Sequence, residues 1–365
     1  MTKTLLYDRH LALGGRMVEF AGWELPVQYP TGPKAEHLAV RERAGLFDID
    51  HMGQVIVSGP DALAFLQRVL TADIAAIPQG QAGYALMCYA DGGTVDDTFV
   101  YALPGRYLVA INASNNVKDT RWLEAQTYGL NVSVRNVSEE TYMLALQGPL
   151  AAAIMQPLTD ADLSALAYHH AVEGTVAGVP GIISHTGYTG EDGFELYLAA
   201  SGAVAAWDAI MAQGAPQGLL PIGLAARDSL RFEAAMPLYG QELGPSISPL
   251  EAGLSWAVSW TKGPFIGREA LLKQRLEGVT RTLVAFRMLD RGVPRHEYPV
   301  LSDGQVVGVV TSGMYAPTLD QFLGLAFVPP ASRRPGTELS IGIRGRENRA
   351  VVVKKPFYIP AYRRS

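Results

Sequence analysis

The sequence predicts an α+β protein that ends in a small all-β module. Strands alternate with single helices along most of the chain, and many neighbouring strands are joined by short turns, which favours antiparallel units over a doubly wound sheet. Beyond about residue 278 the pattern changes to short alternating segments between glycine- or proline-containing turns. A chain of 365 residues exceeds what one hydrophobic core usually supports, so two or three domains are expected.

In the first half, three predicted strands are each followed by a helix. The strands are residues 54–57, 107–112 and 142–146. The first helix carries Leu63, Leu66 and Leu70 at helical spacing, the second covers 119–126, and the third begins at Pro149.

In the second half, strands at 181–185 and 194–198 precede a helix with Val204, Trp207 and Met211 on one face. Residues 219–236 have the apolar spacing of a helix that ends near Pro237. The β module is expected to contain strands at 282–286, 305–310, 338–343 and 350–353.

Composition excludes several classes of function. The net charge of −5 provides no basic stripe for a nucleic acid. The uncharged run 141–159 is interrupted by Gln147-Gly148-Pro149 and by Gln156-Pro157, so we expect a strand, a turn and a helix and no membrane span. The first residues lack the unbroken apolar stretch of an export signal, and we expect a cytoplasmic protein.

Known phosphate, nucleophile and metal motifs are missing. No GxGxxG follows a strand, and neither GxxxxGK[ST] nor GxSxG occurs. Cys88 is the only cysteine and is expected to be a small buried hydrophobe. His169 and His170 should point apart and have no third ligand at zinc-site spacing, so no metal is expected.

Acidic residues in three segments of the chain are considered for a binding site. In the glycine-rich loop 187–193, Glu191 and Asp192 would repel a phosphate, although a plain hairpin turn explains the loop equally well. Glu195 should face away from its apolar neighbours on a strand, where its two acceptors suit a pterin-like edge; an exposed glutamate is the alternative. Of Asp96 and Asp97, which begin a strand after a glycine turn, only one can face a pocket, unless both cap the turn.

Several longer segments occur in one order along the chain. They are FAGWELPVQY from Phe20, FDIDHMGQ from Phe47, GGTVDDTFVY from Gly92, TGYTGEDGFEL from Thr186, GLAARDSLRFEAAMPLYGQEL from Gly223, SPLEAGLSW from Ser248, FIGREAL from Phe265, TSGMYAPTL from Thr311 and VVKKPFY from Val352. Together they resemble the aminomethyltransferases, the T-proteins of the glycine cleavage system, and they span essentially the whole chain.

The resemblance implies a three-domain cloverleaf around a central folate cavity. Two interleaved α+β domains with antiparallel sheets would comprise residues 1–52 with 137–227, and residues 53–136 with 228–277. Residues 278–365 would form a C-terminal β-barrel. In this family tetrahydrofolate accepts a one-carbon unit from the aminomethylated lipoyl arm of H-protein, ammonia is released, and neither a metal nor a nicotinamide takes part.

Site residues are carried over where the motifs match. Asp97 would be the catalytic aspartate, which stabilises positive charge on the transferred carbon and orients folate N10. Glu195 would anchor the pterin, and Tyr188 would lie beside its ring. The anionic folate tail should meet an arginine, for which Arg227 is the first match. Tyr84, Tyr101, Tyr168 and Met52 match positions that line the rest of the folate pocket. Arg364 is the second match for the arginine at the folate tail.

Some alternatives remain open at this level. Several of the pocket tyrosines could be ordinary core residues, and Arg363 could replace Arg364. Residues 242–245 depart from the family pattern beside the cavity. The same fold serves folate-dependent demethylases that act on another amine or sulfonium donor, and non-catalytic folate-binding proteins that assist iron–sulfur cluster assembly. No flavin fingerprint supports the oxidase relatives, and no assembly-factor signature surrounds Cys88.

Overall fold

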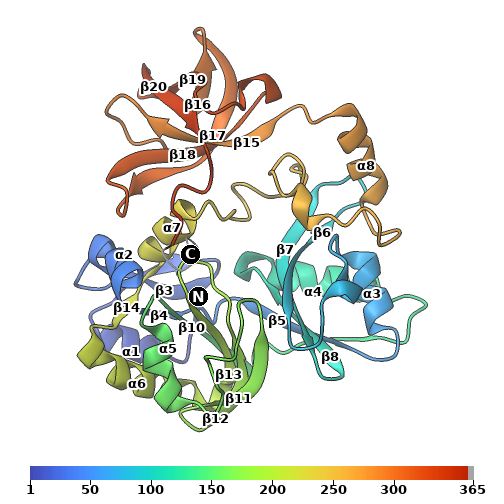
Figure 1. Cartoon of the computed structure of the whole chain (residues 1–365), viewed down its shortest axis with the longest axis vertical. Helices are drawn as coiled ribbons and strands as arrows, with labels where there is room; N and C mark the ends of the chain where they lie inside the picture. The colour runs from blue at the N-terminus through green and yellow to red at the C-terminus, as the bar shows by residue number, and fades with distance from the viewer. Residues whose placement is uncertain (361–365) are drawn as a thin grey trace.

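Three bodies of secondary structure make up the protein, and in Figure 1 they lie around the middle of the molecule. The computed structural model describes residues 1–360. Two bodies combine helices with mainly antiparallel sheets, and the third is a closed barrel. The predicted α+β class with a C-terminal barrel is therefore confirmed.

The first body is built on a six-stranded sheet in the order β11-β12-β13-β10-β4-β14. Its large core contains Trp207, which is 1% exposed, together with Phe194 and Leu196. The strands are β4 (Gly45–Asp48), β10 (Thr141–Gln147), β11 (Ala171–Val176), β12 (Val179–Ser184), β13 (Gly193–Ala199) and β14 (Leu220–Ile222). A small sheet of β1 (Thr2–Lys3), β2 (Arg16–Phe20) and β3 (Trp23–Gln28) lies beside it, with helices α1 (Tyr7–Ala12), α2 (Pro33–Glu42), α5 (Ala151–Met155), α6 (Ala203–Gly214) and α7 (Leu224–Glu233).

The second body is a five-stranded antiparallel sheet in the order β6-β7-β8-β5-β9, covered by two helices. Its strands are β5 (Gly53–Ser58), β6 (Ala82–Cys88), β7 (Thr94–Leu103), β8 (Arg106–Ile111) and β9 (Ser133–Asn136), and its helices are α3 (Ala62–Val69) and α4 (Asn116–Ala125). Cys88 ends β6 at 1% exposure, and burial raises the pKa of its thiol to about 12. The prediction of a small buried hydrophobe is confirmed.

The third body is the closed barrel β15-β18-β17-β16-β19-β20. Phe286, Val310 and Ile341 fill its interior and are fully buried. Helix α8 (Arg268–Glu277) precedes β15 and lies beside the second body in Figure 1. The barrel strands are β15 (Thr282–Met288), β16 (Pro299–Ser302), β17 (Gln305–Ala316), β18 (Gln321–Val328), β19 (Glu338–Ile343) and β20 (Arg346–Val353).

Most predicted elements are present, with two corrections. Residues 219–236 are not one helix, because Leu220 to Ile222 pair with β4 as a strand and helix α7 begins only at Leu224. Strand pairing thus overrides the helical spacing of the apolar residues. Of the leucines at helical spacing, Leu66 is buried but Leu63 is 38% exposed, because the buried face of α3 runs through Phe65 and Leu66. The proposed domain boundaries remain a prediction.

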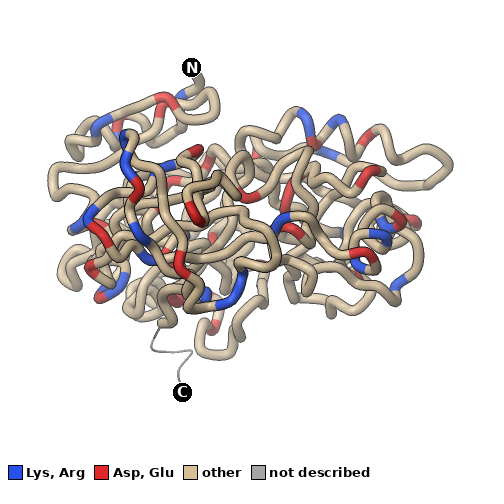
Figure 2. The backbone as a smooth tube through the Cα atoms, turned by 90° about the horizontal axis from the view of Figure 1, so that it is seen from above, with Lys and Arg blue, Asp and Glu red and all other residues tan. Residues whose placement is uncertain are grey.

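Charged residues of both signs are interspersed over the molecule in Figure 2, with no continuous basic stripe in that view.

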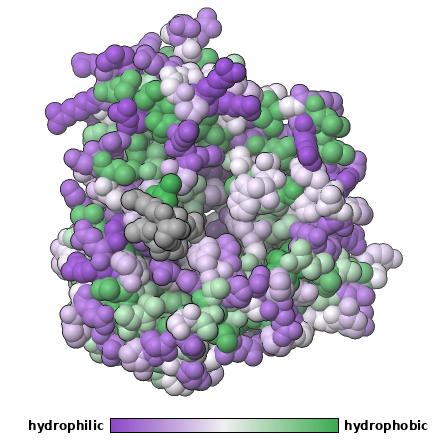
Figure 3. Space-filling view, viewed as in Figure 1, coloured by the Kyte–Doolittle hydropathy of each residue, from purple (hydrophilic) through white to green (hydrophobic). Residues whose placement is uncertain are grey.

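Where the two sheets approach each other, Arg106 of β8 and Glu173 of β11 form an ion pair of 2.5 Å beside a cleft of about 640 Å³. Figure 3 shows that the face seen in Figure 1 is hollowed near its middle. No helix among residues 1–360 is long and apolar enough to cross a membrane.

Candidate active site

Strand β7 separates the two adjacent acids. Because side chains alternate along a strand, Asp97 shares a face with Phe99 and Tyr101, while Asp96 points to the opposite face. Asp97 and Phe99 are only half-buried, whereas Asp96 is completely buried. The turn before the strand requires glycine, because a Cβ on Gly93 would lie 1.8 Å from the carbonyl oxygen of Pro245. The loop that departs from the family pattern therefore packs directly against this turn.

Two side chains hold the Asp97 carboxylate. The Tyr84 hydroxyl donates to Oδ2 at 2.9 Å, and Asn112 Nδ2 donates to Oδ1 at 2.8 Å. Asn112 also donates to Asp96 Oδ1 at 2.8 Å, so one amide bridges the two acids. The sequence reasoning missed Asn112. Its only sequence signal is an amide residue directly after strand β8, opposite the acidic pair.

Asp97 can exchange a proton near neutral pH. Burial, followed by the negative charge of Asp96, raises the pKa of Asp97 to about 7, while the hydrogen bonds from Tyr84 and Asn112 act in the opposite direction. A group whose pKa lies near the working pH can accept a proton and return it within one catalytic cycle. The carboxylate form also offers a negative charge to a developing cation.

We expect the Asp97 titration to appear in the pH profile. If the carboxylate is the active form, kcat/KM rises as the pH increases through about 7. Tyr84→Phe removes a hydrogen bond that stabilises the carboxylate, so this limb should move to higher pH by roughly half a unit to one unit. Initial rates between pH 5.5 and 9 measure the shift. Tyr239→Phe is the control, because the Tyr239 hydroxyl donates to the Thr94 carbonyl instead; an unmoved limb in Tyr84→Phe would contradict the assignment.

Glu195 belongs to strand β13 of the first body, whereas Asp97 belongs to strand β7 of the second. It faces away from Phe194 and Leu196, which are buried in the first core, as the strand alternation predicts. Its Oε2 receives hydrogen bonds from Thr186 Oγ1 at 2.6 Å and from the Tyr101 hydroxyl at 3.4 Å. Both bonds end on Oε2, which leaves Oε1 available to a ligand. Burial raises the pKa of Glu195, and the Thr186 hydrogen bond and the charge of Arg227 oppose that shift.

Arg227 lies next to this carboxylate and to Tyr188. Its guanidinium carbon is 4.6 Å from the centroid of the Tyr188 ring, and Tyr188 is fixed by a hydrogen bond from its hydroxyl to the Pro237 carbonyl. Within residues 1–360 the guanidinium of Arg227 has no ion pair, unlike its neighbour Arg231, which pairs with Asp228 and Glu242. Desolvation lowers the pKa of Arg227. An unpaired arginine in such surroundings suits an anionic or carbonyl group of a ligand.

Aromatic rings lie between Asp97 and Glu195. Phe99 contacts Tyr84, Tyr101 and His169, with ring centroids 6.2, 6.0 and 5.2 Å apart, and Tyr168 stacks on His169 at 4.1 Å. Met52 packs at the edge of the same core as Phe99 and Tyr101. The structure therefore brings Tyr84 to Asp97 and Tyr101 to Glu195, whereas Tyr168 stacks on His169 and contacts the His185 ring edge-on at 5.5 Å. Arg364 lies outside the described residues.

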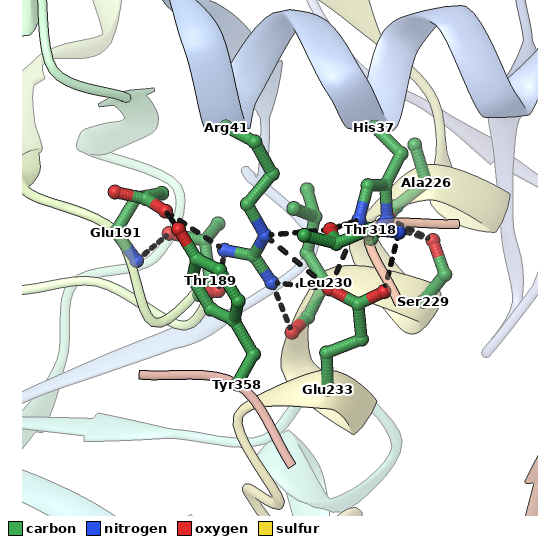
Figure 4. Close-up of polar contacts among 10 residues, drawn as sticks. All are labelled: His37, Arg41, Thr189, Glu191, Ala226, Ser229, Leu230, Glu233, Thr318 and Tyr358. Atoms are coloured by element: carbon green, nitrogen blue, oxygen red, sulfur yellow. Dashed lines mark hydrogen bonds and ion pairs between the residues drawn. The ribbon is translucent and has the colours of Figure 1, made fainter. Parts of the chain in front are cut away.

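The glycine-rich loop uses its two acids internally. Glu191 Oε1 accepts a hydrogen bond of 2.6 Å from Tyr358, and Asp192 Oδ1 lies 2.5 Å from His185 Nε2. Arg41 donates to the Thr189 carbonyl at 2.8 Å and lies 3.4 Å from Glu191. Figure 4 shows Arg41, Thr189, Glu191 and Tyr358 below helix α2. The sequence predicts that these acids would repel a phosphate, and in the structure both fix the loop between strands β12 and β13.

The same buried network joins the barrel to the first body. Glu233 at the end of α7 is 0% exposed and accepts hydrogen bonds from Arg41 Nη2 at 3.0 Å and from the Thr318 backbone at 2.9 Å. His37 Nε2 contacts the same carboxylate at 3.1 Å and the Thr318 hydroxyl at 2.8 Å. Thr318 belongs to the turn between β17 and β18.

We expect Glu233→Ala to destabilise the protein strongly. It leaves the more distant Glu191 as the acidic partner of the buried Arg41 guanidinium, and breaking such a buried pair typically costs about 3–5 kcal/mol. The urea midpoint should fall clearly. Asp290→Ala removes an exposed partner of Arg349 and should change the midpoint little, because exposed pairs contribute roughly 0–1 kcal/mol. Equal midpoints for the two variants would contradict a structural role for the network.

Among residues 1–360, no three His, Cys, Asp or Glu side chains are grouped so that they could hold a metal ion. His169 stacks on Tyr168, and His170 Nδ1 contacts the Tyr168 carbonyl at 3.2 Å. The adjacent histidines therefore both contact Tyr168, one at its ring and the other at its carbonyl.

Known proteins resemble this chain over its whole length. Residues 6–262 match the GCVT N-terminal domain, and residues 281–358 match the glycine cleavage T-protein C-terminal barrel domain. A protein named aminomethyltransferase from Moorella thermoacetica is 53% identical over 98% of both chains, and one from Geobacillus kaustophilus is 50% identical over 98% of this chain and 99% of its own. The crystal structure of glycine cleavage system aminomethyltransferase T from Bartonella henselae superposes with a TM-score of 0.93 at 34% identity and 98% coverage of both chains.

Proposed function

The chain belongs to the glycine cleavage T-protein family and is an aminomethyltransferase, and we propose that its central site passes a one-carbon unit from a lipoyl-bound donor to tetrahydrofolate. The observation that carries this proposal is that two carboxylates, Asp97 and Glu195, lie at the two ends of one run of contacting aromatic residues. Asp97 has a pKa near 7, and Glu195 has an open oxygen beside the unpaired Arg227.

The residues present fit a folate. Glu195 Oε1 can accept from the amino group and ring N–H of a pterin, and the half-buried Tyr188 ring is suited to a flat face of the pterin. Tyr101 is fully buried and supports the site through its hydrogen bond to Glu195. Arg227 can meet an anionic or carbonyl group of the same ligand, and we retain the folate tail as its proposed partner. Bound in this way, tetrahydrofolate supplies the two nitrogens that take up the carbon.

The bonds that form and break in the overall reaction indicate what Asp97 must do. The S-aminomethyl carrier and tetrahydrofolate yield the dihydrolipoyl carrier, ammonium and 5,10-methylenetetrahydrofolate. Two bonds to carbon form at N5 and N10, the C–S and C–N bonds of the donor break, and the two folate N–H protons end on sulfur and on ammonia. Asp97 stabilises the positive charge that develops on the carbon, and its carboxylate is a proton acceptor beside the folate nitrogens. Tyr84 and Asn112 keep the carboxylate oriented.

The partner is the second element of the proposal. The matched family and the similar crystal structure are named for the glycine cleavage system, and we propose the lipoyl-carrying H-protein of that system as the partner of this chain. We also propose that the reaction takes place in the cytoplasm.

One assay tests the function directly. Purified protein is mixed with aminomethylated lipoyl H-protein, with and without tetrahydrofolate, and ammonia and methylenetetrahydrofolate are measured. We expect folate-dependent formation of both products in equal amounts. Tight folate binding without turnover would favour a demethylase that uses another donor, and the absence of binding as well would overturn the enzymatic role of the site.

A further inference from the structure

An exposed tryptophan lies one ring away from the Asp97 carboxylate. Trp256, in the short turn η6 (Ser255–Ala257), is 69% exposed, whereas Trp207 in the first core is 1% exposed. Its ring stacks on Tyr84 with a centroid distance of 5.4 Å and an interplanar angle of 27°. The Tyr84 hydroxyl in turn donates to Asp97 Oδ2 at 2.9 Å. One face of the indole is thus covered by a site residue, and the ring is otherwise largely open to solvent.

The position of Trp256 is fixed by its neighbours. Leu254 and Ala257 on either side of it are 8% and 5% exposed, and both belong to a buried cluster that includes Leu86. The Ala257 carbonyl accepts a hydrogen bond of 2.8 Å from Thr71 Oγ1. The chain therefore presents the indole from an anchored turn. An exposed aromatic ring held in this way is characteristic of a contact for a partner.

We infer that Trp256 binds the aminomethyl-bearing lipoyl arm of the donor, an inference that rests on the proposed function. The chemistry of the arm fits the indole in two respects. Its ammonium group is attracted to the negative face of an indole ring, and its thioether sulfur makes favourable contacts with aromatic rings. Tyr84 stacks on the indole and also donates a hydrogen bond to the Asp97 carboxylate, which stabilises the transferred carbon. Trp256 is thus a positioning and specificity residue for the donor, separate from the folate contacts at Glu195.

The kinetic test separates the donor from the acceptor. Trp256→Ala should raise KM for the aminomethylated lipoyl carrier by at least about tenfold, leave KM for tetrahydrofolate unchanged, and keep kcat within about threefold of wild type. Trp256→Phe should recover most of the affinity, because a smaller aromatic face remains. Tyr128→Ala is the matched control, since Tyr128 is 91% exposed in the turn after α4, away from the Asp97 strand. It should behave as wild type.

Each other outcome has a defined meaning. An unchanged carrier KM in Trp256→Ala would overturn the inference, as would an increase confined to the KM for tetrahydrofolate, which would assign the ring to the folate. A fall in kcat with a shifted pH limb would show that Trp256 only supports Tyr84. Failure of the wild-type protein to turn over would count against the proposed function instead.

A binding experiment reads the same contact without turnover. Free lipoamide, whose disulfide quenches indole fluorescence on contact, is titrated into the wild type and into Trp256→Phe. We expect saturable quenching in the wild type and its loss in the variant, with folding checked by circular dichroism. Equal quenching in both proteins would place the arm elsewhere.

Discussion

Asp97→Asn should lower turnover by at least about tenfold, equivalent to about 1.4 kcal/mol of activation free energy, while tetrahydrofolate binding is retained. The amide keeps the size of the side chain but cannot take up a proton near pH 7 or place a negative charge beside the transferred carbon. Its Oδ1 can still accept from Asn112, and Tyr84 can rotate its hydroxyl to accept from Nδ2. The pocket for folate should therefore keep its shape.

Stopped-flow ammonia release and equilibrium folate binding, measured on the same preparation, test this expectation. The pH dependence adds a second signature, because the limb near pH 7 should disappear with the titrating group. Asp91→Asn is a suitable control, since Asp91 is exposed and its carboxylate accepts from the Gly93 backbone in the turn before β7. Turnover near that of the wild type in Asp97→Asn would remove Asp97 from the catalytic role.

Much of this site follows from local sequence rules. Strand alternation predicts that Glu195 faces away from Phe194 and Leu196, and that Asp96 and Asp97 face opposite sides, because the period of a strand is two. The folded chain obeys both rules. The roles of Asp97 and Glu195 came instead from the family motifs, and they remain predictions for this chain.

The partners of these acids could not be predicted from local patterns. Asn112 reaches Asp97 across the β7–β8 hairpin, and Trp256 reaches Tyr84 from more than 150 positions away along the chain. Glu191 and Asp192 were considered for their charge toward a ligand, but their partners Arg41 and His185 only become visible when the chain is folded. The partners of these acids depend on which side chains the fold brings together, and the spacing of residues along the sequence does not give those contacts.

Glu195→Ala should weaken tetrahydrofolate binding by about tenfold to a hundredfold, because removing one partner of a buried hydrogen-bonded group costs roughly 1–3 kcal/mol. The substitution removes the open Oε1 and also leaves Thr186 and Tyr101 without their shared acceptor. Glu195→Gln should lose less affinity, because its amide oxygen still accepts one hydrogen bond. Isothermal titration calorimetry of the three proteins gives the order directly.

The same prediction has a pH signature that separates Glu195 from Asp97. Burial raises the pKa of Glu195 above its ordinary value, so lowering the pH protonates the wild-type carboxyl and should weaken folate binding, while Glu195→Gln should not respond through this group. At saturating folate, Glu195→Ala should retain much more turnover than Asp97→Asn, because the charge beside the transferred carbon is intact. Glu173→Ala controls for the loss of a carboxylate from the same sheet, since Glu173 is exposed on β11. If Glu195→Ala bound tetrahydrofolate as tightly as Glu173→Ala, the pterin anchor would have to lie on another residue.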